Sequence, residues 1–444
     1  MPIFKRKAYN RILEWKNDSK GTSALLIEGA RRVGKSTLVK GFAKNEYKSY
    51  ILIDFSNASD NIKKCFEEVS DLDMFFLMLQ TYTGVKLIER NSVIIFDDVQ
   101  LFPKARQAIK YLVADGRYDY IETGSFISIK KNVKDILIPS EEQKLTLYPL
   151  DYEEFMWAIG NDTYQLLKYF LEKQQTTFIN KKLMRDFRIY MAVGGMPQAV
   201  KAYLGKKTFW EIDKVKRSII KLYEDDFRKI DASGFTERIY KDIPAQLSHN
   251  KKRYVISSAT GRKTQKKDFE RLFNVIDSQT ALVSYNVTAP DIKLSSTKDP
   301  DCYKMYIADI GLLVTLMYID RPAKENVLYE QLLADKLPAN LGYLYENVAA
   351  QMIAASGKPL YHHTWLKNEG THYYDIDFLI RRKQKVIPVD IKPAAIKSHK
   401  SIGAFCEKYS QIADRPYIFS QNDISKDGQT LLLPIYMLPF LLEP

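Results

Sequence analysis

Short apolar runs alternate with helical patterns along the first 125 or so residues of the chain. The apolar runs, each of a length that suits one buried strand, lie at 24–27, 50–55, 93–96 and 118–122. The helical patterns lie at 8–16, 61–68, 73–82 and 103–114. Strands that alternate with helices predict an α/β domain with a parallel sheet.

The pattern changes twice after residue 150. Residues 151–235 are mostly helical, with an interruption at Gly194-Gly195-Met196-Pro197. Helices near 236–247 and 265–277 then precede β-like runs at 281–287 and 302–309, an order typical of a winged helix. From about 339 onward the pattern is helix, strand, strand, helix, and the apolar tail at 431–442 predicts a buried final strand or helix.

These changes predict four domains. We expect an α/β domain at 1–160, a helical lid or linker at 161–235, a winged-helix-like domain at 236–320 and a second α/β domain at 321–444.

Composition narrows the class of protein. Hydrophobic residues make up 45% of the 444 residues and charged residues 27%, which is ordinary for a globular protein. The net charge of +13 favours a polyanion partner such as nucleic acid, with a solvated basic surface as an equal alternative. Three cysteines without CxxC spacing speak against a disulfide framework or zinc site and fit the cytoplasm. We expect no signal peptide and no membrane helix.

A phosphate-binding motif follows the first apolar run. Gly29-Ala30-Arg31-Arg32-Val33-Gly34-Lys35-Ser36 matches GxxxxGK[ST] between a strand and a helix, and Thr37 continues into that helix. Backbone N–H groups of such a loop wrap the phosphates, Lys35 reaches the β and γ phosphates, and the Ser36 hydroxyl holds Mg²⁺. The sequence therefore predicts binding of ATP and Mg²⁺; the alternative is a turn that no longer binds nucleotide.

Two carboxylates end the apolar run at 93–96. Asp97 is placed to orient Mg²⁺, and Asp98 could polarise the attacking water as a general base. After the next strand, the hydroxyl of Ser125 or of Thr123 could sense the γ-phosphate. We therefore expect Lys35, Asp98 and Ser125 as catalytic residues.

Several short motifs together resemble those of a known protein family. These are the phosphate loop, Phe96-Asp97-Asp98-Val99-Gln100, Thr123-Gly124-Ser125, Tyr148–Phe155, Gly194–Pro197, Tyr306–Leu312, Tyr345-Glu346-Asn347 and Asp375–Phe378. The chain resembles the prokaryotic AAA+ ATPases that carry a C-terminal domain of unknown function with a nuclease-like fold. This resemblance implies an AAA+ core, a winged-helix module and a C-terminal domain of the PD-(D/E)xK nuclease type.

Two departures from that family bear on catalysis. AAA+ ATPases usually have Glu where this chain has Asp98, whose side chain is one methylene shorter. The sequence therefore predicts ATP binding more firmly than fast ATP hydrolysis. Many relatives have Gly-Arg ahead of the motif that contains Pro149-Leu150. This chain has Ser140-Glu141 at that place, so no arginine finger can be assigned. AAA+ relatives often form rings, and a homo-oligomer and a monomer both stay open.

The C-terminal part carries clustered carboxylates. Glu346 lies on an expected helix, Asp377 on a strand, and Asp390-Ile391-Lys392 on the next strand. This order resembles the PD-(D/E)xK nucleases, in which the acids hold Mg²⁺ over a phosphate and the lysine positions water. The alternative is that the acids serve structure or binding without cleavage.

A basic segment precedes and enters the helix expected near 265–277. Its cations are Lys251, Lys252, Arg253, Arg262, Lys263, Lys266 and Lys267. In a helix-turn-helix arrangement that helix would face double-stranded DNA. A solvated surface, or docking against another domain of the chain, explains the charges equally well.

The leading hypothesis is thus a cytoplasmic Mg-dependent ATPase coupled to DNA binding or processing. A nucleotide-gated scaffold that does not cut DNA, and an ATP-regulated metal-dependent nuclease, are the alternatives.

Overall fold

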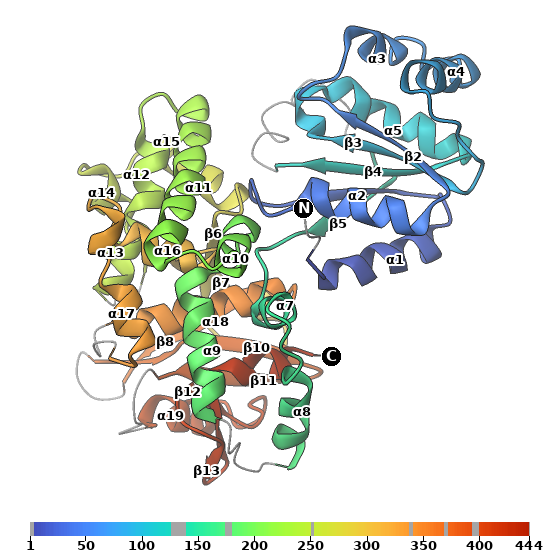
Figure 1. The fold of residues 1–444 in the computed structure, drawn as a ribbon. Coiled ribbons are helices and arrows are strands. Elements are labelled where there is room, and N and C mark those ends of the chain that lie inside the picture. Colours follow the sequence, from blue (N-terminus) through green and yellow to red (C-terminus); the bar gives the residue numbers. More distant parts are fainter. Residues whose placement is uncertain are drawn as a thin grey trace. The chain divides into compact units, whose positions relative to one another are not determined.

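The computed structural model describes residues 4–125, 139–173, 180–249, 253–336, 341–367, 372–392 and 399–443. The chain divides into two compact units (Figure 1). The first comprises residues 1–148 with 277–279, and the second comprises residues 149–276 with 280–444.

The first unit is built on a parallel sheet. Within its described residues the strands are β1 (Ala24–Glu28), β2 (Ser49–Asp54), β3 (Ser92–Asp97), β4 (Asp119–Gly124) and β5 (Glu142–Thr146). They lie in the order β2-β3-β4-β1-β5, and every neighbouring pair is parallel. The parallel sheet expected from the alternating pattern is confirmed.

Helices cover both faces of this sheet (Figure 1). They are α1 (Lys7–Ser19), α2 (Lys35–Glu46), α3 (Asp60–Cys65), α4 (Leu72–Thr83) and α5 (Pro103–Asp115), with the 3₁₀ turn η1 (Val99–Leu101). Leu25 and Ile27 of β1 join a core with α1 and α2, whereas Leu26 joins a second core with α4 and α5. Because side chains alternate along a strand, an unbroken apolar run can serve both cores.

The second unit begins with helices. They are α7 (Tyr152–Ala158), α8 (Tyr164–Lys173), α9 (Asn180–Val193), α10 (Pro197–Leu204), α11 (Phe209–Ile230), α12 (Phe235–Lys241), α13 (Ile243–Ser248), α14 (Ile256–Thr260) and α15 (Lys266–Asp277). Later helical elements are η2 (Leu294–Thr297), α16 (Ile310–Leu316), η3 (Ala323–Glu325), α17 (Leu328–Leu333), α18 (Tyr343–Ala355), α19 (Lys400–Lys408), η5 (Ile435–Met437) and α20 (Leu438–Leu442).

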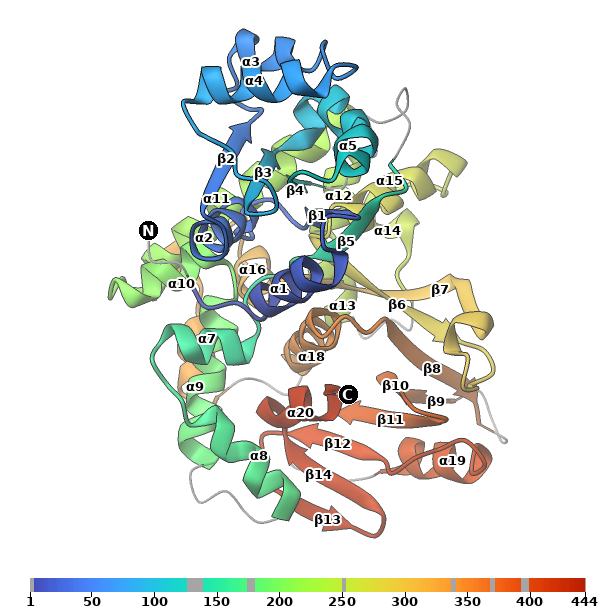
Figure 2. The same cartoon turned by 90° about the vertical axis from the view of Figure 1, so that its right-hand side faces the viewer.

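Two sheets complete the second unit in the described residues (Figure 2). One has the order β7-β6-β8-β9 and the other the order β10-β11-β12-β14-β13. Their bounds are β6 (Ala281–Val287), β7 (Lys298–Ile307), β8 (Leu360–Leu366), β9 (Tyr373–Ile376), β10 (Phe378–Arg382), β11 (Lys385–Ile391), β12 (Tyr417–Ser420), β13 (Ser425–Asp427) and β14 (Thr430–Pro434). Ile402 and Phe405 of α19 pack on the second sheet, and the tail forms β14 and α20, as expected.

The hairpin expected to be the wing of a winged helix belongs to a larger sheet. β6 pairs antiparallel with β7 and also parallel with β8, through Ser284 opposite Leu360. The boundary expected between residues 320 and 321 therefore separates strands of one sheet. The division of residues 161–444 into three domains stays a prediction.

Residues from three of the motifs that carry the resemblance meet inside the second unit. The buried Asp309 carboxylate accepts hydrogen bonds from the backbone N–H groups of Gly195 at 2.6 Å and Leu312 at 2.9 Å. A Cβ on Gly195 would lie 2.0 Å from the Leu150 carbonyl oxygen, so only glycine fits there. These motifs thus join α16, the turn at 194–197 and the segment directly before α7.

Among the residues described in both units, no helix is long and apolar enough to cross a membrane.

Candidate nucleotide site and acidic cluster

The phosphate loop connects β1 to α2 and requires glycine at two positions. A Cβ on Gly29 would lie 2.4 Å from the Leu147 carbonyl oxygen. Gly34, which precedes α2, has φ +102°, a conformation that disfavours any side chain. Arg32 also has positive φ, at +70°. The loop therefore has the tight backbone that the motif predicts, with the N-terminus of α2 at its end.

Lys35 lies buried against its own loop. Its ammonium donates hydrogen bonds to the carbonyl oxygens of Gly29 at 2.8 Å and Ala30 at 3.1 Å. Burial lowers the Lys35 pKa to about 8, although Asp98 and Asp97 act in the opposite direction. Its ammonium group is thus held where a phosphate would enter the loop.

Ser36 and Asp97 come together from elements far apart in sequence. The Ser36 hydroxyl donates to Asp97 Oδ1 at 2.8 Å, and the Thr123 hydroxyl donates to the same oxygen. Burial raises the Asp97 pKa, while these two hydrogen bonds lower it. A hydroxyl beside a carboxylate is an oxygen donor set that suits Mg²⁺, so these residues fit the ion that the motif implies.

Asp98 follows β3 in a left-handed conformation, with φ +54°. Its backbone N–H donates to Thr123 Oγ1 at 3.3 Å, and its carboxylate accepts a hydrogen bond from Gln100 Nε2 at 3.0 Å. The carboxylate is therefore oriented by a neighbour on η1. Asp98 lies directly after Asp97, and its role as a general base stays a prediction.

Of the two hydroxyls that the sequence offered, Thr123 of β4 is the one that contacts Asp97. Ser125 follows the end of β4, and its catalytic role stays a prediction. Sequence reasoning missed one contributor to this site, Arg6. The buried Arg6 donates to the carbonyl oxygens of Val33 at 3.2 Å and Tyr148 at 2.6 Å. Arg6 thereby braces the loop, and no motif around it signals this.

A buried ion pair lies on the α5 side of the same sheet. Arg106 of α5 donates three hydrogen bonds to Glu142 of β5, at 2.9, 3.0 and 3.2 Å. Glu122 of β4 is fully buried beside them, and burial followed by the charge of Glu142 raises its pKa well above the usual range. The pattern of apolar runs gave no sign of these charges.

The C-terminal acids do gather, as an acidic cluster of Glu346, Asp375, Asp377 and Asp390. Lys304 of β7, which the sequence reasoning did not include, lies 3.2 Å from both Glu346 and Asp375. Lys392 lies 3.5 Å from Asp390. The Tyr306 hydroxyl donates to Glu346. Two lysines thus accompany four carboxylates.

Hydrogen bonds from the backbone hold Asp377 and Asp390 together. Asp390 lies on β11 as expected, whereas Asp377 lies at the bend between β9 and β10 and not on a strand. The Asp377 N–H donates to Asp390 Oδ1 at 3.4 Å, and the Ile391 N–H donates to Asp377 Oδ2 at 2.8 Å. Burial raises the Asp377 pKa to about 8, against the attraction of Lys392. Asp375 also loses solvation, but Lys304 and Thr364 hold its pKa at about 2.

This arrangement does not suit a metal ion. Among the described residues, no three His, Cys, Asp or Glu side chains are grouped so that they could hold one. The Lys304 ammonium already lies between Glu346 and Asp375 and offsets part of their negative charge, which is the task that a divalent ion would perform. We therefore derive no metal-dependent step from Glu346, Asp377, Asp390 and Lys392.

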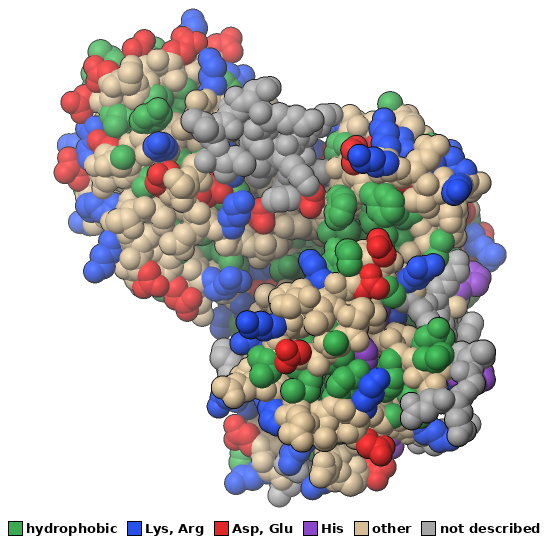
Figure 3. All heavy atoms as spheres, turned by 180° about the vertical axis from the view of Figure 1, so that it is seen from behind, with side chains coloured by type: hydrophobic (Ala, Val, Ile, Leu, Met, Phe, Trp, Pro, Cys, Tyr) green, Lys and Arg blue, Asp and Glu red, His purple; other side chains and the backbone are tan. Residues whose placement is uncertain are grey.

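The described cations of the basic segment differ in whether a carboxylate compensates their charge. Lys251 and Lys252 lie outside the described residues. Arg262 donates to both carboxylate oxygens of Asp268 at 2.9 Å, so its charge is compensated. The other cations of the segment, Arg253, Lys263, Lys266 and Lys267, are exposed. Figure 3 shows one face of the molecule, on which basic and acidic side chains are interspersed.

Models of three protein families match successive parts of the chain. Residues 21–156 match an AAA domain. Residues 184–323 and 341–438 match two domains of unknown function, DUF8612 and DUF4143. The first match covers the parallel sheet, the phosphate loop and the two strand-end carboxylates.

Solved structures resemble the chain only loosely. The Walker-type ATPase of Pyrococcus abyssi is 16% identical, over 71% of this chain and 96% of its own, with a TM-score of 0.43. Cdc6p from Pyrobaculum aerophilum is 10% identical over 76% and 97%, and a signal transduction ATPase with a tetratricopeptide repeat sensor from Pyrococcus horikoshii is 14% identical over 79% and 48%, each with a TM-score of 0.24.

These superpositions are too loose to transfer a function. A search of the curated proteins gives no match. Residues 21–156 thus match an AAA domain, and the parallel sheet and the loop between β1 and α2 agree with this match.

Proposed function

We propose that the protein is a Mg-dependent ATPase that converts ATP to ADP and phosphate in its first unit. The observation that carries the proposal is the hydrogen bond from Ser36 to Asp97 beside the buried Lys35. Gly29 to Thr37 would wrap the phosphates, Ser36 and Asp97 would hold Mg²⁺, and Asp98 would orient and deprotonate the attacking water. Bound Mg²⁺ would neutralise charge on the phosphates.

The test is ATP hydrolysis by the purified protein in Mg²⁺, beside Lys35→Ala. Lys40→Ala is the matched control, because Lys40 is exposed on the same helix α2. Loss of charged hydrogen bonds to phosphate costs about 1.5–3 kcal/mol, or about 10- to 150-fold in affinity. Equal ATP affinity in the wild type and Lys35→Ala would refute the site.

We propose further that the ATPase is coupled to double-stranded DNA. The exposed Lys263, Lys266 and Lys267, at and before the start of α15, support this, as does the net charge of +13. Helices α12, α13 and α15 before a hairpin are compatible with a winged helix. Duplex DNA should accelerate ATP turnover, and Lys266→Glu with Lys267→Glu should weaken binding and flatten its salt dependence.

A nucleotide-gated scaffold is the alternative that ATP binding without turnover would favour. The short Asp98 side chain is the reason to keep it. For the third possibility, a nuclease, the order of Glu346, Asp377, Asp390 and Lys392 supports a nuclease-like fold, whereas the ion pairs of Lys304 speak against metal-dependent cleavage. Mg²⁺-dependent nicking of DNA that Asp390→Ala abolishes would reinstate it.

The proposal extends to the cellular compartment and the oligomeric state. Cys65, Cys302 and Cys406 are free thiols, which fits a reducing cytoplasm. Assembly into a homo-oligomer is compatible with an AAA domain, and light scattering with and without ATP would test it.

A further inference from the structure

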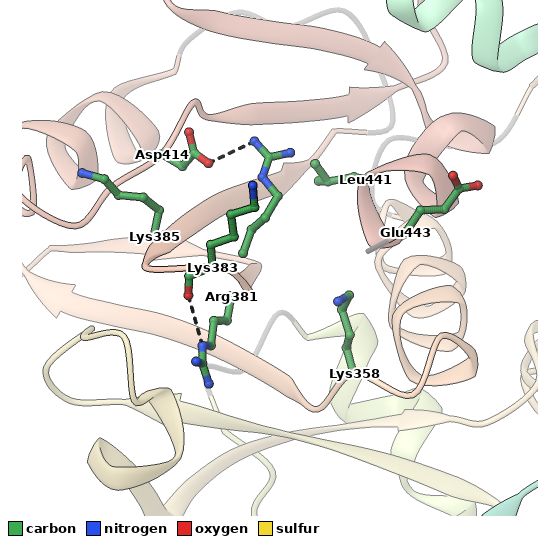
Figure 4. A pocket seen from close by; sticks show the side chains of 8 residues that line it. Lys358, Arg381, Lys383, Lys385, Asp414, Leu441 and Glu443 are labelled. Carbon is green, nitrogen blue, oxygen red and sulfur yellow. Dashed lines mark hydrogen bonds and ion pairs between the residues drawn. The ribbon is translucent and has the colours of Figure 1, made fainter. Parts of the chain in front are cut away.

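A basic groove runs along one end of the C-terminal sheet. It consists of two adjoining pockets, with volumes of about 660 and 310 Å³, that share Lys358 and Arg381. The larger pocket is drawn in Figure 4. The basic groove is lined by six cations, Lys293, Lys358, Arg381, Arg382, Lys383 and Lys385.

The cations come from separate parts of the fold. Lys383 lies at the turn between β10 and β11 and has positive φ, at +54°, while Arg381 and Lys385 flank that turn. Lys358 follows α18, and Lys293 precedes η2. Segments separated by almost a hundred residues thus bring positive charge to one hollow, although like charges repel each other.

Both carboxylates of the groove are already paired. Asp414 lies 3.0 Å from Arg382, and Glu443 lies 2.7 Å from Lys168. In the described ranges, no carboxylate forms an ion pair with the other five cations of the groove. Among the residues that the structure describes, the Lys385 ammonium donates to the Gln411 carbonyl oxygen, at 2.9 Å. The groove therefore has an excess of uncompensated positive charge.

We propose that the basic groove binds the phosphate backbone of nucleic acid. Uncompensated cations along a groove attract a chain of phosphates, whereas a single small anion would need only one or two of them. Tyr361 is the one aromatic residue in the lining, and it is buried, so the described groove offers no surface on which bases could stack. Binding is accordingly independent of sequence.

The basic groove is distinct from the acidic cluster. Arg382 pairs with Lys385 at the turn end of the β10–β11 hairpin, whereas Asp377 and Asp390 lie at its open end. Five residues of β10 separate the two ends by roughly 13–17 Å. The groove is also a different surface from the exposed lysines of α15. Binding there does not depend on the proposed ATPase activity.

The test compares two double variants of the full-length protein. Lys358→Gln with Lys383→Gln removes two cations of the groove. Lys206→Gln with Lys426→Gln is the matched control, since both lysines are exposed outside the groove, and Lys206 shares the positive φ of Lys383. Fluorescence anisotropy measures binding of one labelled 20-nucleotide sequence, single-stranded and as a duplex, between 50 and 200 mM salt. Equal unfolding midpoints verify that the variants are folded.

If both lysines contact phosphates, the salt slope for duplex falls by about 1.8, and by about 1.4 for a single strand. The loss of affinity between 50 and 200 mM salt then becomes about 12-fold smaller for duplex and about 7-fold smaller for single strand. The control should keep the wild-type slope, and whichever nucleic acid changes is the one that the groove binds.

Three results would overturn the proposal. One is an unchanged slope in the groove variant while Lys266→Glu with Lys267→Glu loses binding, which would leave the proposed coupling through α15 intact. Another is no binding of either nucleic acid at 50 mM salt, which would remove the DNA coupling as well but not the ATPase. The third is loss of binding to anionic phospholipid vesicles with unchanged binding to nucleic acid.

Discussion

Lys304→Met should destabilise the second unit, because it leaves Glu346 and Asp375 without the ammonium between them. Removing one partner of a buried ion pair costs about 3–5 kcal/mol. The Asp375 side chain is 38% exposed, so water screens part of its charge. We therefore expect a loss of about 2–3 kcal/mol at neutral pH, with methionine filling most of the space of the lysine stem.

The loss should depend on pH. Lys304 holds the Asp375 pKa at about 2, and without it burial raises that pKa. A carboxyl whose folded pKa exceeds its unfolded value makes the protein less stable as pH rises through that range. The difference between wild type and Lys304→Met should thus be larger at pH 8 than at pH 5.

Urea unfolding followed by circular dichroism measures this effect. With a slope of about 2–3 kcal/mol/M, the midpoint should fall by about 1 M at pH 7. Lys298→Met is the control, since Lys298 is exposed on the same strand. Millimolar Mg²⁺ should raise the midpoint of Lys304→Met more than that of the wild type, because the variant frees oxygen ligands. A variant as stable as the wild type at both pH values would refute the reasoning.

Three further predictions concern the first unit. ATP affinity should fall, by at most about tenfold per pH unit, as pH rises above 8, because burial lowers the Lys35 pKa to about 8 and phosphates prefer the charged form; calorimetry from pH 7 to 9 checks this. Asp98→Asn should slow ATP hydrolysis by about 10²–10⁴-fold with ATP affinity nearly unchanged, whereas Asp98→Glu, with its longer side chain, should speed hydrolysis. Steady-state release of phosphate measures both effects. Equal rates in the wild type and the two variants would show that Asp98 is not the base. Glu122→Gln should raise the melting temperature at pH 7 and less so at pH 5, because the raised pKa of this buried carboxyl disfavours the folded state as pH rises above the unfolded value; a lower melting temperature at pH 7 would contradict this.

The geometry of the candidate nucleotide site could be predicted from the sequence because each of its parts is a short continuous motif. Gly29 to Ser36 form one continuous loop, and Asp97 directly follows an apolar strand. Parallel strands bring their carboxyl ends to one edge, so the meeting of Ser36 with Asp97 follows from the pattern. The choice of Thr123 over Ser125 does not, since it depends on which hydroxyl points toward Asp97.

The acidic cluster shows why the rest could not be predicted. The order of Glu346, Asp377 and Asp390 is visible in the sequence, but their charge balance depends on Lys304, which is 42 residues from Glu346 and 71 from Asp375. Lys304 lies on a hairpin that sequence reasoning placed in a different domain. Only the pairing of β6 with β8 shows that the hairpin shares a sheet with the C-terminal region.

The motifs that carry the family resemblance also differ in how much they indicate about function. The phosphate loop combines glycine positions with Lys35 in a pattern that is typical of phosphate binding, so this pattern predicts chemistry. Asp309 and Gly195, by contrast, are buried and satisfy each other, and Lys216 donates to the Gly311 carbonyl oxygen at 3.0 Å in the same interior. A pattern maintained by such packing identifies a fold without identifying a partner. The proposed binding of nucleic acid therefore depends on the exposed cations of α15 and of the basic groove, which lie outside those motifs.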